Sequence, residues 1–326
     1  MSTEATAPKP RVAARFSSRR WARLRDYGFV LVFIALFVFL SLSTDTFFRT
    51  RNLLNILDQS APVGIIACAV TICIISGVFD LSTGSIFGVA AVVASKVAKN
   101  VDPTLGIGVG ILTGLVLGSI NGVLVHVTRI NSFIGTLATS IAFRGLAIIA
   151  TGGMIVTVTN PTFGLLGRSD LLGAKYTVWV FGVFFIGTAF LLARTTFGRA
   201  VYAVGGNPEA ARLSGIRVGL VRGACFALSG LAAGIAGVMA ASRTSSAQAD
   251  LGTGLELAAI AAAVVGGTSI MGGEGAVWRG VLGVLTLALI GNGFDLLNID
   301  TNYQMIVQGV LILVAVAADQ LLRRRS

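Results

Sequence analysis

Long apolar stretches, separated by short polar connections, occupy most of the chain. A helix needs about 20 mostly apolar residues to cross the hydrocarbon core of a membrane. Stretches close to this length predict ten membrane-spanning helices, of which the third and the eighth are short and flanked by glycine. They cover roughly residues 27–43, 53–76, 82–98, 104–126, 132–150, 176–193, 220–241, 254–270, 277–294 and 303–320.

The composition agrees with this pattern. Hydrophobic residues make up 55% of the 326 residues and charged residues only 12%, whereas a soluble domain has about 25% charged residues. The net charge of +11 does not indicate nucleic-acid binding, because the basic residues cluster at the termini and in a few loops without interleaved aromatic residues. The sequence therefore predicts an all-α protein in contact with membrane lipid. Its cysteines, Cys68, Cys73 and Cys225, lie in apolar stretches and are expected to be free thiols.

Lysine and arginine residues indicate the orientation, because they accumulate on the cytoplasmic side of a membrane. With the N-terminus inside, 17 of them fall on the inner side and 7 on the outer side, while Arg144 lies within a helix. Both termini are therefore expected inside. The expected segments are a basic tail (1–26), a transmembrane domain (27–320) with halves of about 27–175 and 176–320 and a cytoplasmic loop (194–219), and a basic end (321–326).

The two halves carry matching motifs. Residues 80–84 (DLSTG) resemble residues 250–254 (DLGTG), and Asn121-Gly122 matches Asn292-Gly293 at almost the same offset. Five predicted helices, an odd number, separate the matched elements. The second copy is therefore expected to face the opposite way, as two inverted-topology halves of five helices each. Such repeats are typical of transporters with a central pathway.

Polar residues at the third helix indicate where that pathway lies. Only about 16 apolar residues, ~24 Å of helix, follow the segment 80–85, less than the hydrocarbon core of about 30 Å. The segment either caps this helix or lies below the membrane surface, as a break that lines a cavity. A second irregular patch, residues 266–275, follows the eighth helix. The candidate pathway residues are Asp80, Ser82, Ser85, Asn121, Arg144, Glu256 and Asn292.

Ionisable residues within the predicted helices are few. Arg144 either extends to the membrane interface or takes part in the pathway. Glu256 lies just inside its helix and is also within reach of water. The sequence shows no relay of Asp, Glu and His across the membrane and suggests no metal site. Glycines 106, 110, 114, 118 and 122 share one face of the fourth helix, which is expected to pack closely against another helix.

A short polar segment between the sixth and seventh helices carries the start and stop signals of a helix. Asn207 is a good N-cap, Pro208 suits the first helical position and Glu209 suits the helix dipole. Gly215 is placed to end the helix. A helix of about seven residues, ~10 Å, neither crosses a membrane nor is stable alone. It either rests on lipid or docks onto a cytoplasmic partner.

Four motifs in this order resemble the permeases of ribose-type sugar ABC importers. Residues 196–199 (TFGR) and 203–216 (AVGGNPEAARLSGI) are similar to the coupling loop of that family. Residues 77–85 (GVFDLSTGS) are similar to its Asp-Leu-Ser-x-Gly-Ser signature, with Val78-Phe79 where glycine-isoleucine is commoner. The other matches are residues 252–262 and 265–269, in its eighth-helix region, and 303–309, in its last helix. The resemblance extends from about residue 28 to 320.

This resemblance implies the transmembrane subunit of an importer for a monosaccharide (a ribose-like pentose, a hexose or a related polyol) in the bacterial inner membrane. It implies a second permease copy, identical or closely homologous, a cytoplasmic ATP-binding subunit that uses ATP and Mg, and an extracytoplasmic sugar-binding protein. Since the chain has no GxxxxGK[ST] loop, it is expected to be non-catalytic and to bind no cofactor itself. Docking onto the ATPase is assigned to Gly205, Gly206, Asn207, Pro208, Glu209, Ala210, Ala211, Arg212, Leu213, Ser214 and Gly215.

Two other functions fit part of the pattern. A standalone secondary sugar carrier also has inverted repeats, but a proton-coupled carrier usually has paired intramembrane carboxylates, which the sequence does not show. A membrane scaffold without transport would not need interrupted helices.

Overall fold

The computed structural model describes residues 29–300, 302–304, 306–307, 309–310 and 313. The predicted basic tail (1–26) and basic end (321–326) lie outside these residues, as does most of the predicted last helix (303–320). The described part is mostly helical, as the composition predicts.

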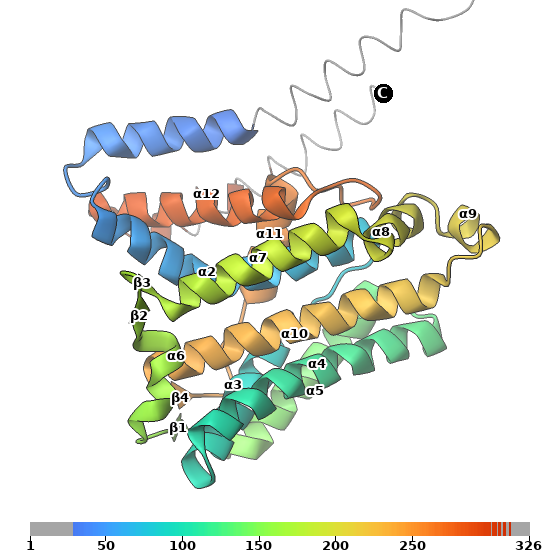
Figure 1. Ribbon diagram of the computed structural model, residues 1–326, viewed down its shortest axis with the longest axis horizontal. Helices are drawn as coiled ribbons and strands as arrows, with labels where there is room; N and C mark the ends of the chain where they lie inside the picture. The colour runs from blue at the N-terminus through green and yellow to red at the C-terminus, as the bar shows by residue number, and fades with distance from the viewer. Residues whose placement is uncertain (1–28, 301, 305, 308, 311–312, 314–326) are drawn as a thin grey trace, which may run out of the picture.

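In the described part, helices are joined by short connections and four two-residue strands (Figure 1). Strand β1 pairs antiparallel with β4, and β2 pairs antiparallel with β3. After a first helix over Phe29–Ser43, the elements are α2 (Thr50–Ile75), α3 (Thr83–Asn100), α4 (Pro103–Thr128), α5 (Ser132–Thr151), β1 (Val156–Thr157), a 3₁₀ turn (Pro161–Gly164), α6 (Leu165–Arg168), β2 (Asp170–Leu171), β3 (Ala174–Lys175), α7 (Tyr176–Arg194), α8 (Thr196–Gly206), α9 (Pro208–Leu213), α10 (Val218–Thr244), β4 (Ser246–Ala247), α11 (Leu255–Val265) and α12 (Val277–Leu296).

Among the described residues, six helices are long and apolar enough to cross a membrane, namely α2, α4, α5, α7, α10 and α12. The first helix and α11 are apolar but shorter. The predicted number of ten spanning helices is therefore not confirmed. The prediction of one helix over residues 254–270 is wrong, because α11 ends at Val265 and the chain turns at Gly266 and Gly267. Gly267 has a φ of +92°, which a helix does not accommodate.

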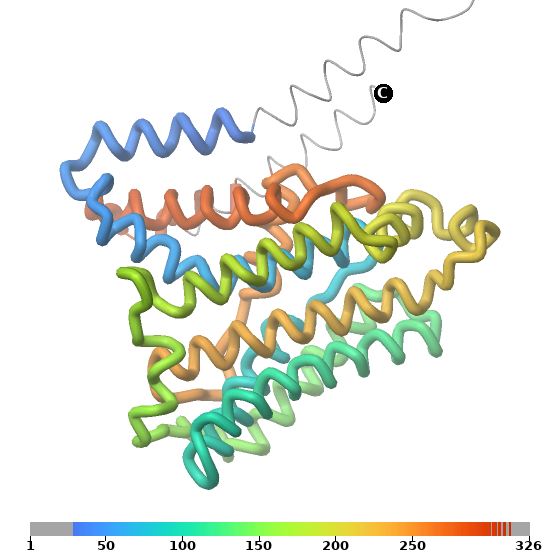
Figure 2. Tube along the Cα trace, in the orientation of Figure 1, coloured from blue at the N-terminus to red at the C-terminus, as the bar shows by residue number. Residues whose placement is uncertain are grey.

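Two groups of three helices pack in the same way. One group consists of α2, α11 and α12, and the other of α10, α3 and α4. Helices α2 and α10 pack against each other, α12 packs along α2, and α4 packs along α10. Helix α11 contacts α12 and α2 in the same way as α3 contacts α4 and α10. Figure 2 shows α10 beside α4 over most of its length. This correspondence of α2–α3–α4 with α10–α11–α12 agrees with the motifs that the two halves of the sequence share.

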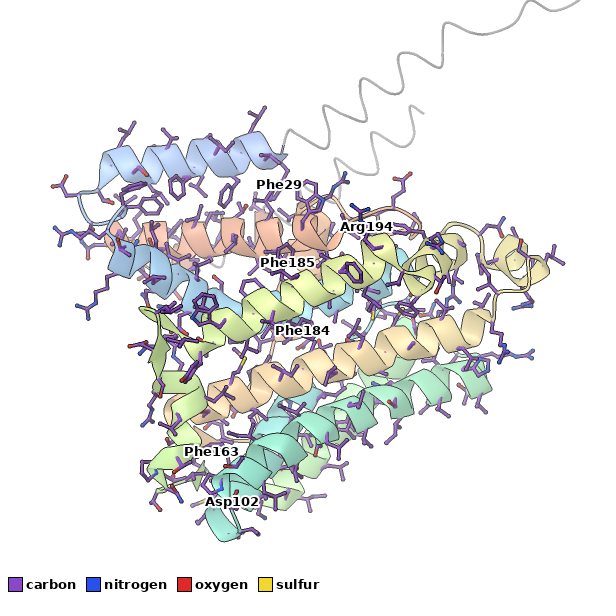
Figure 3. The ribbon with its side chains drawn as sticks, in the orientation of Figure 1. Phe29, Asp102, Phe163, Phe184, Phe185 and Arg194 are labelled. Carbon is purple, nitrogen blue, oxygen red and sulfur yellow. The ribbon has the colours of Figure 1, made fainter. Side chains whose placement is uncertain are left out.

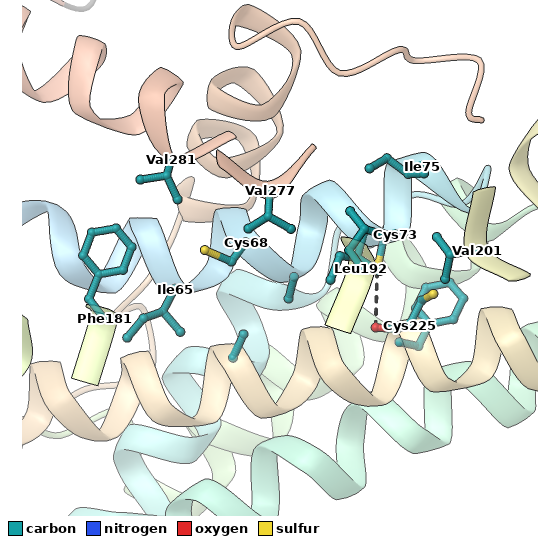
Figure 4. Close-up of a cluster of buried hydrophobic side chains, with 14 of the residues drawn as sticks. Ile65, Cys68, Cys73, Ile75, Phe181, Leu192, Val201, Cys225, Val277 and Val281 are labelled. Atoms are coloured by element: carbon teal, nitrogen blue, oxygen red, sulfur yellow. Dashed lines mark hydrogen bonds between the residues drawn. The ribbon is translucent and has the colours of Figure 1, made fainter. Parts of the chain in front are cut away.

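The core between α2 and α10 consists of small and branched apolar side chains and is closed by residues of α7 and α12 (Figure 4). Its three cysteines are buried and free, as predicted. Cys73 Sγ of α2 donates a hydrogen bond of 3.3 Å to the carbonyl oxygen of Cys225 of α10. Since lipid tails are as apolar as these side chains, such helices associate through close packing and interhelical hydrogen bonds.

The predicted glycine face of α4 is buried against α3 and α10. A Cβ atom at Gly118 would lie 2.7 Å from the Cα of Gly230, which is closer than side chains ever approach. The two backbones therefore touch, and the prediction of a closely packed face is confirmed.

The two ends of the bundle differ. Helices α8 and α9 lie at one end, beside Arg194 at the end of α7, and this is called the α9 end (Figures 1 and 3). The strands, α6 and the buried Phe163 lie at the other, called the strand end. There Ser242 Oγ, near the end of α10, donates a 2.5 Å hydrogen bond to the carbonyl oxygen of Phe163. The connection between α5 and α7 is thereby attached to α10.

Candidate functional site

The segment predicted to dock onto a partner forms α9. Asn207 caps this helix as predicted, because its Oδ1 accepts hydrogen bonds of 3.0 Å from the N–H groups of Glu209 and Ala210. Pro208 is the first helical residue. Gly215 follows the end of the helix with a φ of +82°, a conformation that favours glycine.

Helix α9 presents most of its surface outwards. Its buried residue is Ala211, which packs with Val204 and Val218. Glu209 and Arg212 form an exposed ion pair of 3.6 Å. Leu213 is 87% exposed. The caps and the contact of Ala211 therefore hold a helix too short to be stable alone, while an apolar side chain stays uncovered.

A second helix occupies the loop predicted over residues 194–219. Residues 196–206 form α8, so that Gly205 and Gly206 end this helix and do not belong to α9, contrary to the single short helix expected from the sequence. The signal that sequence reasoning missed is Thr195, whose Oγ1 accepts a 3.2 Å hydrogen bond from the N–H of Gly198, as an N-cap does.

Helix α8 contacts the interior of the bundle through Gly205. A Cβ atom at this position would overlap the carbonyl oxygen of Ile75, the last residue of α2, and would lie 2.6 Å from the nitrogen of Gly273. The N–H of Gly273 also donates a 2.8 Å hydrogen bond to that carbonyl oxygen. The irregular patch predicted over residues 266–275 therefore lies between the end of α2 and α8.

Tyr202 makes a second contact between α8 and this patch. Its Oη donates a hydrogen bond of 2.8 Å to the carbonyl oxygen of Gly275. Burial raises the pKa of the Tyr202 phenol above its usual value, and the charge of Arg279 acts in the opposite direction. The phenol is therefore protonated at neutral pH and remains a hydrogen-bond donor.

Asp80 lies in the non-helical segment 76–82 between α2 and α3, and it is fully buried. Its Oδ1 accepts hydrogen bonds from the N–H and the Oγ of Ser82, at 3.0 and 2.5 Å. Asn121 of α4 donates from Nδ2 to Ser82 Oγ at 2.6 Å. Ser85 Oγ donates to the carbonyl oxygen of Ser82 at 2.8 Å. Four of the candidate pathway residues therefore form one buried hydrogen-bonded chain.

Helix α5 holds the backbone of this segment. The N–H of Leu81 donates to Thr136 Oγ1 at 2.9 Å, and the N–H of Phe79 donates to Ser132 Oγ at 3.1 Å. Irregular backbone at membrane depth persists only where such groups, or water, satisfy it. Ser82 occupies the N-cap position of α3 without a side-chain hydrogen bond to the helix. Since Asp80 bonds Ser82 instead of the helix, the interpretation that this segment only caps α3 is wrong.

A second non-helical segment, residues 248–254 between α10 and α11, packs against the first turn of α3. A Cβ atom at Gly252 would lie 2.7 Å from the carbonyl oxygen of Gly84. The motifs that the sequence analysis matched, residues 80–84 and 250–254, therefore lie directly against each other, one from each half of the chain.

Arg144 of α5 holds the second segment. Its Nη1 donates to the carbonyl oxygens of Ala249 and Leu251, at 2.6 and 3.1 Å. The guanidinium group of Arg144 is therefore directed at the backbone of the second segment.

Several buried polar atoms near the meeting point have no hydrogen-bond partner among the described residues. They are Thr83 Oγ1, Asn121 Oδ1 and Glu256 Oε2, the last of which lies beside Gly84. Unsatisfied buried groups are costly, so water or a ligand is expected to bind them. Ser229 of α10 lies beside Asp80. Sequence reasoning missed Ser229, since a single serine in an apolar helix carries no distinguishing pattern.

Asn292 lies apart from this cluster. It forms a reciprocal amide pair with Asn52 of α2, with Nδ2–Oδ1 distances of 2.9 and 3.0 Å. Asn292 belongs to α12 and faces α2 at this pair. The structure thus separates it from the other candidates, which it brings together: Asp80, Ser82, Ser85, Asn121, Arg144 and Glu256.

Comparison with known proteins places this geometry in context. Residues 52–316 match the family model described as branched-chain amino acid transport system, permease component. The ribose import permease of Escherichia coli K12 is 37% identical over 94% of this chain and 96% of its own length. The L-arabinose ABC transporter permease of Azospirillum brasilense is 39% identical over 100% and 97%, and the ribose import permease of Bacillus subtilis 168 is 41% identical over 91% and 93%. No solved structure matches the chain.

Proposed function

Because this chain belongs to the family of transport-system permease components that its sequence matches over residues 52–316, we propose that it is the transmembrane subunit of an ATP-driven monosaccharide importer. It is a multi-pass protein of the bacterial inner membrane. Relatives that match almost its full length are named for ribose and for L-arabinose. Both are neutral pentoses. The substrate class of the proposal is a ribose-like pentose, a hexose or a related polyol.

The observation that carries this proposal is the surface of α9. A helix of six residues that is capped by Asn207, anchored by Ala211 and uncovered at Leu213 has the form of a docking element. The partner is a cytoplasmic ATP-binding subunit, which would bind ATP and Mg, whereas this chain would bind neither. The α9 end of the bundle is then cytoplasmic and the strand end extracytoplasmic.

The contacts of α8 suggest how motion at α9 reaches the pathway. Only Asn207 separates α8 from α9. A displacement of α9 therefore shifts Gly205, which abuts Ile75 and Gly273. Ile75 is directly followed by the segment that carries Asp80. Nucleotide-driven movement would thus reach the place where residues 80–84 and 250–254 meet.

The remaining parts of the proposal concern assembly. A second permease copy, identical or closely homologous, would complete the pathway, and an extracytoplasmic sugar-binding protein would deliver the sugar to the strand end. The two halves would have inverted topology, with ten helices and both termini inside. The near full-length relatives, which are named as import or ABC transporter permeases, do not favour a standalone secondary carrier or a scaffold.

Reconstitution tests this function. The chain would be incorporated into liposomes with its partner ATPase and sugar-binding protein, and uptake of radiolabelled D-ribose and L-arabinose would be measured. Uptake is expected to require both enclosed ATP and the binding protein. Uptake by the chain alone, driven by a proton or sodium gradient, would overturn the proposal and support the carrier.

A further inference from the structure

A polar groove of about 450 Å³ opens between α2, α11 and α12. Two of these helices, α2 and α12, are long and apolar enough to cross a membrane. The groove lies away from the chain of Asp80 and Ser82 and contains one candidate from the sequence analysis, Asn292. Its polar lining consists of Asn55, Gln59, Ser60, Asn292, Asp295 and Gln304.

Helical spacing directs these side chains to one place. Asn55 and Gln59 are four residues apart on α2 and therefore share a face. Asn292 and Asp295 are three residues apart on α12 and share another. Two faces of otherwise apolar helices thus present amide and carboxylate groups to the same groove.

Two amides of α2, those of Asn55 and Gln59, are not satisfied within the described part of the chain. Asn52 and Asn292 bond each other at the edge of the groove, and Ser60 Oγ donates to its own helix at Ile56. Asn55 and Gln59 are exposed, and no side-chain hydrogen bond joins either of them to another described residue. A polar side chain facing hydrocarbon is costly. The groove therefore faces water or a polar ligand instead of lipid tails.

The groove also has an apolar lining. Val63, Val284 and Leu287 contribute branched side chains to it, and Ala258 and Ala261 of α11 contribute only methyl groups. Selective binding sites typically combine such an apolar surface with a few convergent polar groups. A sugar ring offers an apolar C–H face and hydroxyl groups at its edge. Amides donate and accept hydrogen bonds, so they match hydroxyl groups, which do the same.

The charges in the groove restrict the class of ligand. Among the described residues, Asp295 is the one ionisable residue that lines the groove, and neither Lys nor Arg does. A zwitterionic amino acid would bury its carboxylate here without a cationic partner, which is unfavourable. A neutral polyol makes no such demand. The lining of the groove therefore favours a neutral sugar, as in the names of the relatives, over an amino acid, as in the description of the family.

We propose that this groove is a sugar-binding subsite in which the amides of Asn55, Gln59 and Gln304 bind the hydroxyl groups of a monosaccharide. The inference rests on the proposed function and deepens it, since it assigns substrate contact to α2 and α12. The groove lies toward the start of α2 and the end of α12, away from α8, so the subsite precedes the meeting of residues 80–84 and 250–254 on the way into the cell.

Matched variants test the subsite in the reconstituted importer. Gln59→Leu removes one amide from the groove. Ser119→Leu makes a comparable change on an apolar surface patch of α4 formed with Val116 and Val123, and serves as the control. Gly291→Val narrows the groove without removing a polar group, because a Cβ atom there already meets the Gln304 amide at 2.7 Å.

D-ribose and L-arabinose are the probes. With either sugar that the wild-type complex transports, Gln59→Leu and Gly291→Val are expected to lower uptake about tenfold, while Ser119→Leu stays within twofold. All variants should retain the ATPase subunit on purification. In a variant without the native cysteines, Gln59→Cys is expected to react with a membrane-impermeant maleimide and to be protected by the transported sugar but not by L-leucine.

The outcomes separate the inference from the proposed function. If the wild-type complex transports sugar and Gln59→Leu behaves like Ser119→Leu, or if the sugar gives no protection at residue 59, the groove is only a hydrated surface and the inference is overturned. If the wild-type complex shows no ATP-dependent sugar uptake, both proposals fail. Protection by L-leucine instead of a sugar would overturn the ligand class.

Discussion

Gly205 lies against the carbonyl oxygen of Ile75, with no room between them for a Cβ atom. Gly205 is the penultimate residue of α8, and Ile75 is the last residue of α2. The contact joins the element that carries the exposed α9 to the helix that leads into residues 76–82. In the proposed importer, it is a directly packed route from the ATPase-docking element to the interior of the membrane domain.

Substitution of the two neighbouring glycines of α8 tests this contact. Gly205→Ala is expected to cost about 1–3 kcal/mol, because the methyl group must displace backbone atoms, and to reduce sugar uptake and the coupled ATPase rate. Gly206→Ala is the control, since nothing lies within 4 Å of a Cβ atom there. Equal transport by the two variants would show that the contact does not transmit motion.

Leu213 is expected to contribute directly to ATPase binding. Leu213→Asp should weaken retention of the ATPase subunit by about tenfold, the scale expected for an apolar side chain at an interface centre, without affecting insertion into the membrane. Leu172→Asp is a matched control at the strand end, because Leu172 is 88% exposed and Leu213 is 87% exposed. The comparison is made by co-purification and by sugar-stimulated ATP hydrolysis. Retention of the ATPase by Leu213→Asp would place the docking surface elsewhere.

Arg144 is expected to stabilise the second non-helical segment. Arg144→Met removes the donor to the carbonyl oxygens of Ala249 and Leu251, and the loss of charge-assisted hydrogen bonds should destabilise the protein by roughly 2 kcal/mol. A lower unfolding midpoint in detergent, with reduced uptake, would be observed. Lys99→Met, an exposed change at the end of α3, should leave both values unchanged. An equal midpoint for the two variants would contradict this role.

Substitutions at two aspartates distinguish a role in the transport pathway from a helix-capping role. Asp102 caps α4 through a 2.8 Å hydrogen bond from the N–H of Leu105, so Asp102→Ala should cost about 1 kcal/mol and preserve uptake. Asp80→Ala breaks the buried chain to Ser82 and Asn121 and should abolish uptake. Asp80→Asn keeps an acceptor for Ser82 and should retain more activity than Asp80→Ala. Transport at wild-type rates by Asp80→Ala would make its role purely structural.

Much of the fold follows from local pattern. The apolar stretches predict α2, α4, α5, α7, α10 and α12 closely, and the cap of α9 at Asn207 is correct because a capping hydrogen bond spans only two or three residues. The glycine face of α4 was predictable for a similar reason, since helical spacing alone places its members on one side. The similarity of residues 80–84 and 250–254 was also visible in the sequence, but the contact between them was not.

What the sequence alone determined is therefore what depends on neighbours along the chain: the apolar helices, their caps and the resemblance to sugar permeases. Only the tertiary structure decided that Arg144 binds the backbone at Ala249, that Gly205 meets Ile75, and that Asn292 lies apart from Asp80. The tertiary structure alone also revealed the amide groove between α2 and α12. The physical reason is that a buried polar group or a close backbone contact takes its partner from a helix far away in the chain, and packing, not spacing, brings the two together.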